Sequence, residues 1–220
     1  MGQRSAKSRA ALMDAAEELY AKEGLGAVSN RRIAEHAGAS NHSAVAYHFG
    51  SREGLITALV ERHYAQLRQY SERHLATLGD SPSLWDLVAC RILPMVELME
   101  AQPIPSWRAR FLAQAVKDPE LRDRIIKMIS ELGPINDVQN KYLSNIKEGN
   151  AQVMKARSGI LGHMVSGLCA EYEEREEAGT HKGTWVDVGY FLVDATTGML
   201  SAPVTRRDGQ VIPTTGELFI

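Results

Sequence analysis

The sequence predicts an all-α protein, built from a small three-helix domain at the amino terminus and a larger helical domain after it. Three observations support this expectation. Apolar residues recur at steps of three and four along most of the chain, no segment keeps the strict alternation of a strand, and glycine and proline separate the apolar segments. The chain has 220 residues, 44% of them hydrophobic, which is enough for one or two small domains with their own cores.

The first predicted helix covers residues 7–23. Leu12, Ala16, Leu19 and Tyr20 repeat there at helical steps and form one apolar stripe, which can cover the short helices that follow. Residues 1–6 lack this periodicity, so the sequence predicts a mobile basic arm before the helix.

Two short helices joined by a glycine turn are predicted next, as a helix-turn-helix. Ser29 can cap the first of them, and Gly38 can end it because glycine readily takes the left-handed conformation. Ser40 or Asn41 can cap the second, which is predicted to run to about His48.

Six longer helices follow, each predicted from its apolar periodicity, a capping residue or a glycine or proline break. Ser51 is a typical N-cap for the first of them, and Pro94 is expected to kink the second. The predicted ranges are residues 51–78, 83–101, 107–115, 121–146, 151–178 and 184–200.

Positive charge is concentrated near the amino terminus, although the whole chain has a formal net charge of -2. The basic residues in question are Arg4, Lys7, Arg9, Arg31, Arg32 and Arg52. Exposed basic residues are often merely solvated, but beside a helix-turn-helix they favour contact with nucleic-acid phosphates.

The residues expected on the outer face of the second short helix are short, polar or aromatic, and none of them is acidic. These residues are Asn41, His42, Ser43, Ala46 and Tyr47. Short hydrogen-bonding side chains can reach base edges in a major groove, whereas a carboxylate there faces the phosphates. The set therefore indicates a DNA-reading helix.

The segment 29–55 resembles the DNA-binding domain of TetR-type transcriptional repressors. The resemblance lies in Ile33-Ala34, Ala37-Gly38, Tyr47-His48-Phe49 and residues 51–55, and residues 10–24 fit the helix that precedes them in this family. It covers about the first quarter of the chain.

Two departures from the family pattern affect the second short helix. The stretch from Gly38 to Phe49 is one residue longer than is usual, which predicts a looser turn. Ala46 stands where many members have a tyrosine, so one DNA contact typical of the family is missing.

The resemblance implies a DNA-binding domain at residues 1–50, a helical effector-binding and dimerisation domain at 51–202, and an irregular tail at 203–220. It implies a homodimer that reads a palindromic operator in double-stranded DNA and is released by a small apolar or amphipathic effector. The residues expected to contact bases or backbone are Arg32, Asn41, His42, Ser43, Ala46, Tyr47, His48 and Arg52.

The last two predicted helices are the candidates for dimerisation, because small residues there let two backbones approach closely. The expected interface residues are Gly162, Ser166, Ala170, Val188 and Leu192. From the pattern alone, the same helices could equally line the core of a monomer. The resemblance favours the dimer, since TetR-like proteins pair their last two helices in a four-helix bundle.

A pocket for a small molecule is expected among the middle helices, with an apolar lining and a few polar groups. Its candidate residues are His63, Tyr64, Leu67, Arg91, Met95, Met99, Trp107, Phe111 and His163. The alternative for each of them is an ordinary core position, because Met and aromatic residues at helical spacing usually pack inside.

The sequence contains no catalytic, nucleotide-binding or metal-binding motif of the common kinds, so no enzyme activity, cofactor or metal is expected. The two cysteines and the absence of a signal peptide or an apolar span favour a cytoplasmic protein without a membrane partner. Two other functions remain open: a DNA-binding dimer without a small-molecule effector, and a helical enzyme that carries a helix-turn-helix.

Overall fold

The structure is a computed structural model that describes residues 2–130 and 148–203. Every regular element within these residues is an α-helix, which confirms the all-α prediction. The helices are α1 (Gly2–Glu23), α2 (Asn30–His36), α3 (Ala44–Phe49), α4 (Arg52–Leu75), α5 (Leu84–Glu100), α6 (Arg108–Ala115), α7 (Pro119–Ser130), α9 (Glu148–Glu177) and α10 (Trp185–Ser201).

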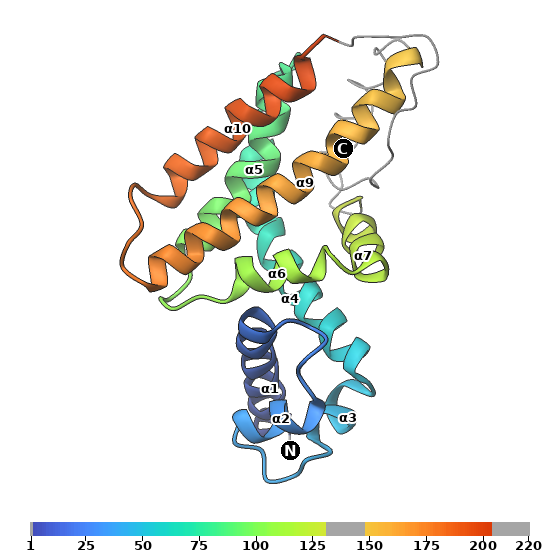
Figure 1. Ribbon diagram of the computed structural model, residues 1–220, viewed down its shortest axis with the longest axis vertical. Helices are drawn as coiled ribbons and strands as arrows, with labels where there is room; N and C mark the ends of the chain where they lie inside the picture. The colour runs from blue at the N-terminus through green and yellow to red at the C-terminus, as the bar shows by residue number, and fades with distance from the viewer. Residues whose placement is uncertain (1, 131–147, 204–220) are drawn as a thin grey trace.

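Figure 1 shows α1, α2 and α3 gathered at one end of the molecule, which we call the head. Helices α5, α9 and α10 form the opposite end, and we call α5 to α10 the body. The long helix α4 leads from the head into the body, and α6 lies where the two meet. A displacement of α4 or α6 therefore reaches the head directly.

The helix starts and stops in the head follow the predicted capping residues. The Ser29 hydroxyl accepts the Arg32 N–H at 3.2 Å, and Gly38 follows α2 with a φ of +65°. The Ser51 hydroxyl accepts the Gly54 N–H at 3.0 Å at the start of α4. Each cap satisfies an N–H that the helix itself leaves free, so local sequence alone decides these boundaries.

Two predicted helix starts in the head are wrong. Helix α1 begins at Gly2, so residues 2–6 are helical, because extending an existing helix adds one hydrogen bond for each residue ordered. Helix α3 begins at Ala44, later than expected, because the Asn41 side chain accepts the Ser43 N–H at 2.9 Å and holds a turn before the helix.

Two boundaries in the body also differ from expectation. Helix α9 already begins at Glu148, so the predicted break at Gly149-Asn150 lies inside it. A glycine costs a helix only about 1 kcal/mol, which a helix of 30 residues can absorb. The helix predicted for 121–146 begins at Pro119, and its part at 131–146 lies outside the described residues, as does the tail from 204 on.

The described residues form two hydrophobic cores. One joins the head to α4, α6 and α7 and contains Tyr20, Leu59 and Phe111. The other lies between α5, α9 and α10 around Trp185 and Leu192. Because α6 contributes Phe111 to the first core and Ala109 to the second, this short helix ties the head to the body.

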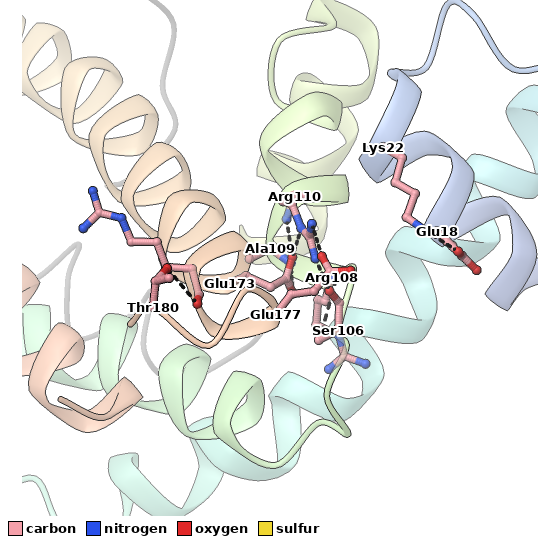
Figure 2. Close-up of polar contacts among 10 residues, drawn as sticks. Glu18, Lys22, Ser106, Arg108, Ala109, Arg110, Glu173, Glu177 and Thr180 are labelled. Atoms are coloured by element: carbon pink, nitrogen blue, oxygen red, sulfur yellow. Dashed lines mark hydrogen bonds and ion pairs between the residues drawn. The ribbon is translucent and has the colours of Figure 1, made fainter. Parts of the chain in front are cut away.

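The start of α6 is held by a carboxylate from α9, as Figure 2 shows. Glu173 is 1% exposed and accepts the backbone N–H groups of Ala109 and Arg110 at 2.9 and 3.0 Å. Its second oxygen also accepts the Arg110 Nε–H at 3.1 Å, and Arg110 reaches on to Glu177 at 2.7 Å. A negative charge at the positive end of a helix is favourable, and a hydrogen bond to a charged group contributes about 1.5–3 kcal/mol.

A buried ionic cluster lies beside the aromatic contact between head and body. The rings of Tyr20 and Phe111 stack with centroids 6.3 Å apart, and the His63 ring lies 5.7 Å from Phe111. Glu17 of α1 pairs with Arg62, and its Oε1 lies 2.9 Å from His63 Nε2. Burial lowers the pKa of His63 below its usual value, in spite of the opposing attraction of Glu17.

Gly189 in α10 allows the closest approach between α10 and α5. A Cβ on this residue would lie 2.6 Å from Val96 Cγ2 and 3.1 Å from Leu93 Cδ2. Gly189→Ala is therefore expected to destabilise the protein by about 1–3 kcal/mol through overpacking, measured by urea unfolding. Gly198→Ala in the same helix is the control, because its Cβ would meet nothing within 4 Å, and it should be neutral or stabilising. Equal effects of the two substitutions would contradict this packing.

Acid is expected to weaken the fold through His63. Below a pH of about 6.5 the imidazole binds a proton in the unfolded chain, whereas burial keeps it neutral in the folded chain. The free energy of unfolding should therefore fall as the pH decreases from about 7 towards the folded-state pKa, by at most about 1.4 kcal/mol per pH unit for this proton.

The measurement is urea unfolding of the wild type and of His63→Gln over this pH range. The variant lacks the titrating group, so the difference between the two pH slopes isolates His63 from the other histidines. Parallel slopes would show that His63 does not take part in the acid response.

Candidate nucleic-acid interface and ligand pocket

Helix α3 has one face buried in the head and the opposite face exposed to solvent. Ala44 and Val45 pack inside the head, while Ala46 is exposed and Tyr47 is 80% exposed. His48 lies with its ring against the Tyr47 ring at 4.9 Å and is half-buried. An aromatic side chain this exposed, on a helix without acidic residues, can stack on or hydrogen-bond to a nucleic acid.

Three of the residues expected on the reading helix lie in the turn before it. Asn41, His42 and Ser43 are all exposed, and the His42 Nδ1 lies 3.7 Å from a Glu35 oxygen. They extend the polar surface of α3 toward α2. The longer spacing between Gly38 and Phe49 is accommodated in the turn, because α3 begins only at Ala44.

The basic residues of the head differ in their surroundings. Arg32 pairs with Glu23 at 2.7 Å and Arg31 with Glu35 at 2.8 Å, so both must exchange partners to bind a phosphate. Arg52 is half-buried, with its guanidinium 5.7 Å from the centre of the Tyr20 ring. These contacts form within one helix or between helices of the head, so they cannot be read from the number of basic residues in the sequence.

Helix α3 is joined to α4 by a tight turn. Gly50 has a φ of +75°, and a Cβ on Gly54 would overlap the Phe49 carbonyl oxygen at the end of α3. The first turn of α4 and the last turn of α3 therefore touch through their backbones. Position 54 accepts only glycine in this geometry.

The structure does not bring the nine candidate ligand residues together. His63 and Phe111 lie in the core that joins head and body, and Met99 lies in the core of the body. His163 is exposed on α9. Leu67 and Met95 are half-buried.

Tyr64 and Arg91 interact electrostatically across α4 and α5. Burial lowers the pKa of Arg91 to about 10, although Tyr64 opposes this shift, and burial raises the pKa of the Tyr64 hydroxyl. Both side chains are half-buried, so this pair is a partly desolvated polar site between the two helices.

A pocket of about 330 Å³ lies between α1, α4 and the segment that joins α5 to α6. Trp107 is the one candidate ligand residue that lines it. The other lining residues are Asp14, Glu17, Arg62, Gln66, Gln102, Pro103, Pro105, Ser106 and Arg108. Sequence reasoning missed them because they come from three separate helices and the connecting loop, and no shared motif marks them.

The predicted interface residues have mixed positions in α9 and α10. Gly162 is buried and Leu192 is fully buried in the body's own core, whereas Ser166, Ala170 and Val188 are half-buried. The large apolar side chains that these helices expose are not those five residues but Ile160, Val186, Tyr190 and Phe191.

No group of three or more His, Cys, Asp or Glu side chains among the described residues has the arrangement of a metal site. No helix in the described part of the chain combines the length and apolar character needed to cross a membrane.

Comparison with known proteins identifies the head and the fold. The family model described as "Bacterial regulatory proteins, tetR family" matches residues 12–59, which include α2 and α3. No curated protein sequence matches the chain.

Solved structures resemble the whole chain at low identity. A TetR family transcription regulator from Marinobacter aquaeolei VT8 is 16% identical, with a TM-score of 0.61 over 90% of this chain and 98% of that chain. SmeT, the repressor of the Stenotrophomonas maltophilia multidrug efflux pump SmeDEF, is 21% identical, with a TM-score of 0.54 over 96% and 97%. A putative TetR-family transcriptional regulator from Mesorhizobium loti MAFF303099 is 15% identical, with a TM-score of 0.50 over 90% and 98%.

The structural matches show a shared fold, and the family model shows that the head is similar to a tetR-family DNA-binding domain. Members of this family are transcription regulators, so the prediction that the chain is not an enzyme is confirmed on that ground. The family model therefore identifies residues 12–59 as a tetR-type DNA-binding domain, and the solved structures show that the chain has the fold of TetR-family regulators.

Proposed function

We propose that the chain is a homodimeric transcriptional repressor that leaves a palindromic operator when a small-molecule effector binds. The observation that carries the DNA-reading part of this proposal is the exposed Tyr47 on α3, beside the buried Ala44 and Val45. The helix thus has one face fixed in the head and one face available to a major groove. Asn41 and Ser43 add short polar groups next to it.

Phosphate attraction is expected mainly from the start of α1. Arg4 and Lys7 are exposed there, and neither has an acidic partner among the described residues. Arg52 adds charge where α4 begins. Because the whole chain has a net charge of -2, binding must depend on this local concentration of charge.

The exposed apolar side chains of α9 and α10 support a homodimer. Phe191 is 62% exposed and Tyr190 and Ile160 are each 48% exposed, on two helices that follow one another in the chain and contact each other. Burial against a second copy would remove this apolar area from water. Two heads about one DNA turn apart, roughly 34 Å, would then bind a palindrome together with increased avidity.

Release by an effector is supported by the way the head is attached. Helices α4 and α6 connect it to the body, so a ligand that binds the two states unequally can change the spacing of the heads. SmeT, which has the same fold, is a repressor of an efflux pump, and this favours a repressor here. The proposed place of action is the cytoplasm, where the operator DNA lies.

The DNA-binding proposal predicts a steep dependence of affinity on salt. Duplexes selected by the protein from a random pool should bind less tightly as salt rises. Lys7→Gln should reduce the slope of log affinity against log salt by about one for each protomer, and so by about two for the dimer. Lys117→Gln is the control, because this exposed lysine lies in the body, and its slope should equal that of the wild type. Tyr47→Ala should lower specific affinity by about tenfold or more. A flat salt response would remove the DNA-binding claim.

The dimer proposal predicts that a glutamate on the exposed face of α10 and a glutamate on α3 have different effects on the oligomeric state. Phe191→Glu should give monomers, because it buries an unpaired carboxylate in the interface. Tyr47→Glu should remain dimeric and lose DNA binding, because Tyr47 lies on the reading face. Sedimentation at low micromolar concentration measures whether each variant is a monomer or a dimer, and a duplex-binding assay measures the loss in Tyr47→Glu. A dimeric Phe191→Glu variant would place the interface elsewhere.

A further inference from the structure

The pocket at the junction of head and body has charged groups in its wall. Asp14 and Glu17 reach it from α1, Arg62 and Gln66 from α4, and Arg108 from the first turn of α6. Pro103, Pro105 and Trp107 supply the apolar part of the lining. It lies outside the apolar interior of the body, where the sequence predicted the effector.

Arg108 is the group in this wall whose hydrogen-bonding capacity is unfilled. Its side chain is only 5% exposed, and its Nη2 donates to Gln66 Oε1 at 2.6 Å. Nε and Nη1 are buried and have no acceptor among the described residues. A guanidinium buried in this way normally finds acceptors for its N–H groups, so the site lacks an anionic or strongly polar partner.

The acidic groups nearby already have other partners. Arg62 pairs with both Asp14 and Glu17, and Glu17 also contacts His63. Glu17 attracts Arg108 through space but forms no hydrogen bond with it in the described structure. No carboxylate of the described residues therefore occupies the Nε and Nη1 donors of Arg108.

We propose that this pocket binds a small organic anion, with a carboxylate or another compact oxyanion at Arg108 and its apolar part against Pro103, Pro105 and Trp107. Charge-assisted hydrogen bonds to a guanidinium are short and strong, which gives the anion a fixed orientation. The pocket volume of about 330 Å³ suits a small aromatic or aliphatic acid.

The position of the pocket gives the ligand a route to the head. One wall belongs to α1 in the head, and the others belong to α4 and to the segment before α6. A ligand held between them changes the energy of any displacement of the head relative to the body. This regulatory consequence rests on the proposed DNA-binding function, whereas ligand binding itself does not.

The test measures binding to the full chain without DNA, by calorimetry and thermal melting. The probes are benzoate and phenylacetate, with benzamide and phenylacetamide as neutral partners of the same shape, and inorganic phosphate as a free oxyanion. The carboxylates should bind saturably and raise the melting temperature, and the amides should not. Saturable binding of phosphate alone would assign the site to the free ion, and equal binding of acids and amides would overturn the proposal.

Gln66→Glu tests the role of Arg108 without removing it. The new carboxylate would take up the guanidinium, so the variant should melt at a higher temperature than the wild type and bind the carboxylate probes at least about tenfold more weakly. Gln69→Glu makes the same charge change at an exposed position outside the lining and should leave probe binding unchanged. Unchanged probe affinity in Gln66→Glu would overturn the assignment.

Arg108→Gln is the complementary variant and should lose the preference for acids over amides. If it does not fold, as a thermal melt would show, Gln66→Glu still decides the question. A separate arm measures duplex binding with and without the carboxylate probes. Probe binding without any duplex binding would reject the proposed DNA function and keep the pocket, whereas duplex binding without probe binding would reject the pocket alone.

Discussion

The structure depends on the buried carboxylate of Glu173. It supplies acceptors for two backbone N–H groups at the start of α6 and for the side chain of Arg110, and it comes from α9, 63 residues along the chain from Arg110. A charge that is 1% exposed is tolerated because each of its oxygens is hydrogen-bonded and a guanidinium faces it. This contact determines where α6 begins and how it is oriented in the body.

Once α6 is placed, the contacts of the head follow. Phe111 meets Tyr20 of α1, and Trp107 lies under the ammonium group of Lys22 at 4.2 Å from the ring centre. Arg110 lies 4.4 Å from the same ring, so the cation that binds Glu173 also contacts the side chain that meets the head. The body and the head are thus connected by a continuous series of close contacts rather than by α4 alone.

The sequence predicted those features of the structure that depend on interactions between residues close together in the chain. Ser29 and Ser51 cap helices through neighbours three positions away, and helical periodicity marked the buried faces. Periodicity does not say which helix a buried face meets, and for that reason Leu192 lies in the body's own core and the candidate ligand residues are dispersed. Arg108 and Gln66 are 42 residues apart, and only the folded chain shows that they meet.

The close approach of Gly54 to the carbonyl of Phe49 has a consequence for how α3 and α4 can move. A Cβ on Gly54 would lie 2.1 Å from the Phe49 carbonyl oxygen, so the end of α3 and the first turn of α4 meet backbone to backbone at this point. Because α3 is short and ends at this contact, we expect it to move together with the first turn of α4. A tilt of α4 is therefore expected to move the exposed face of α3 with it.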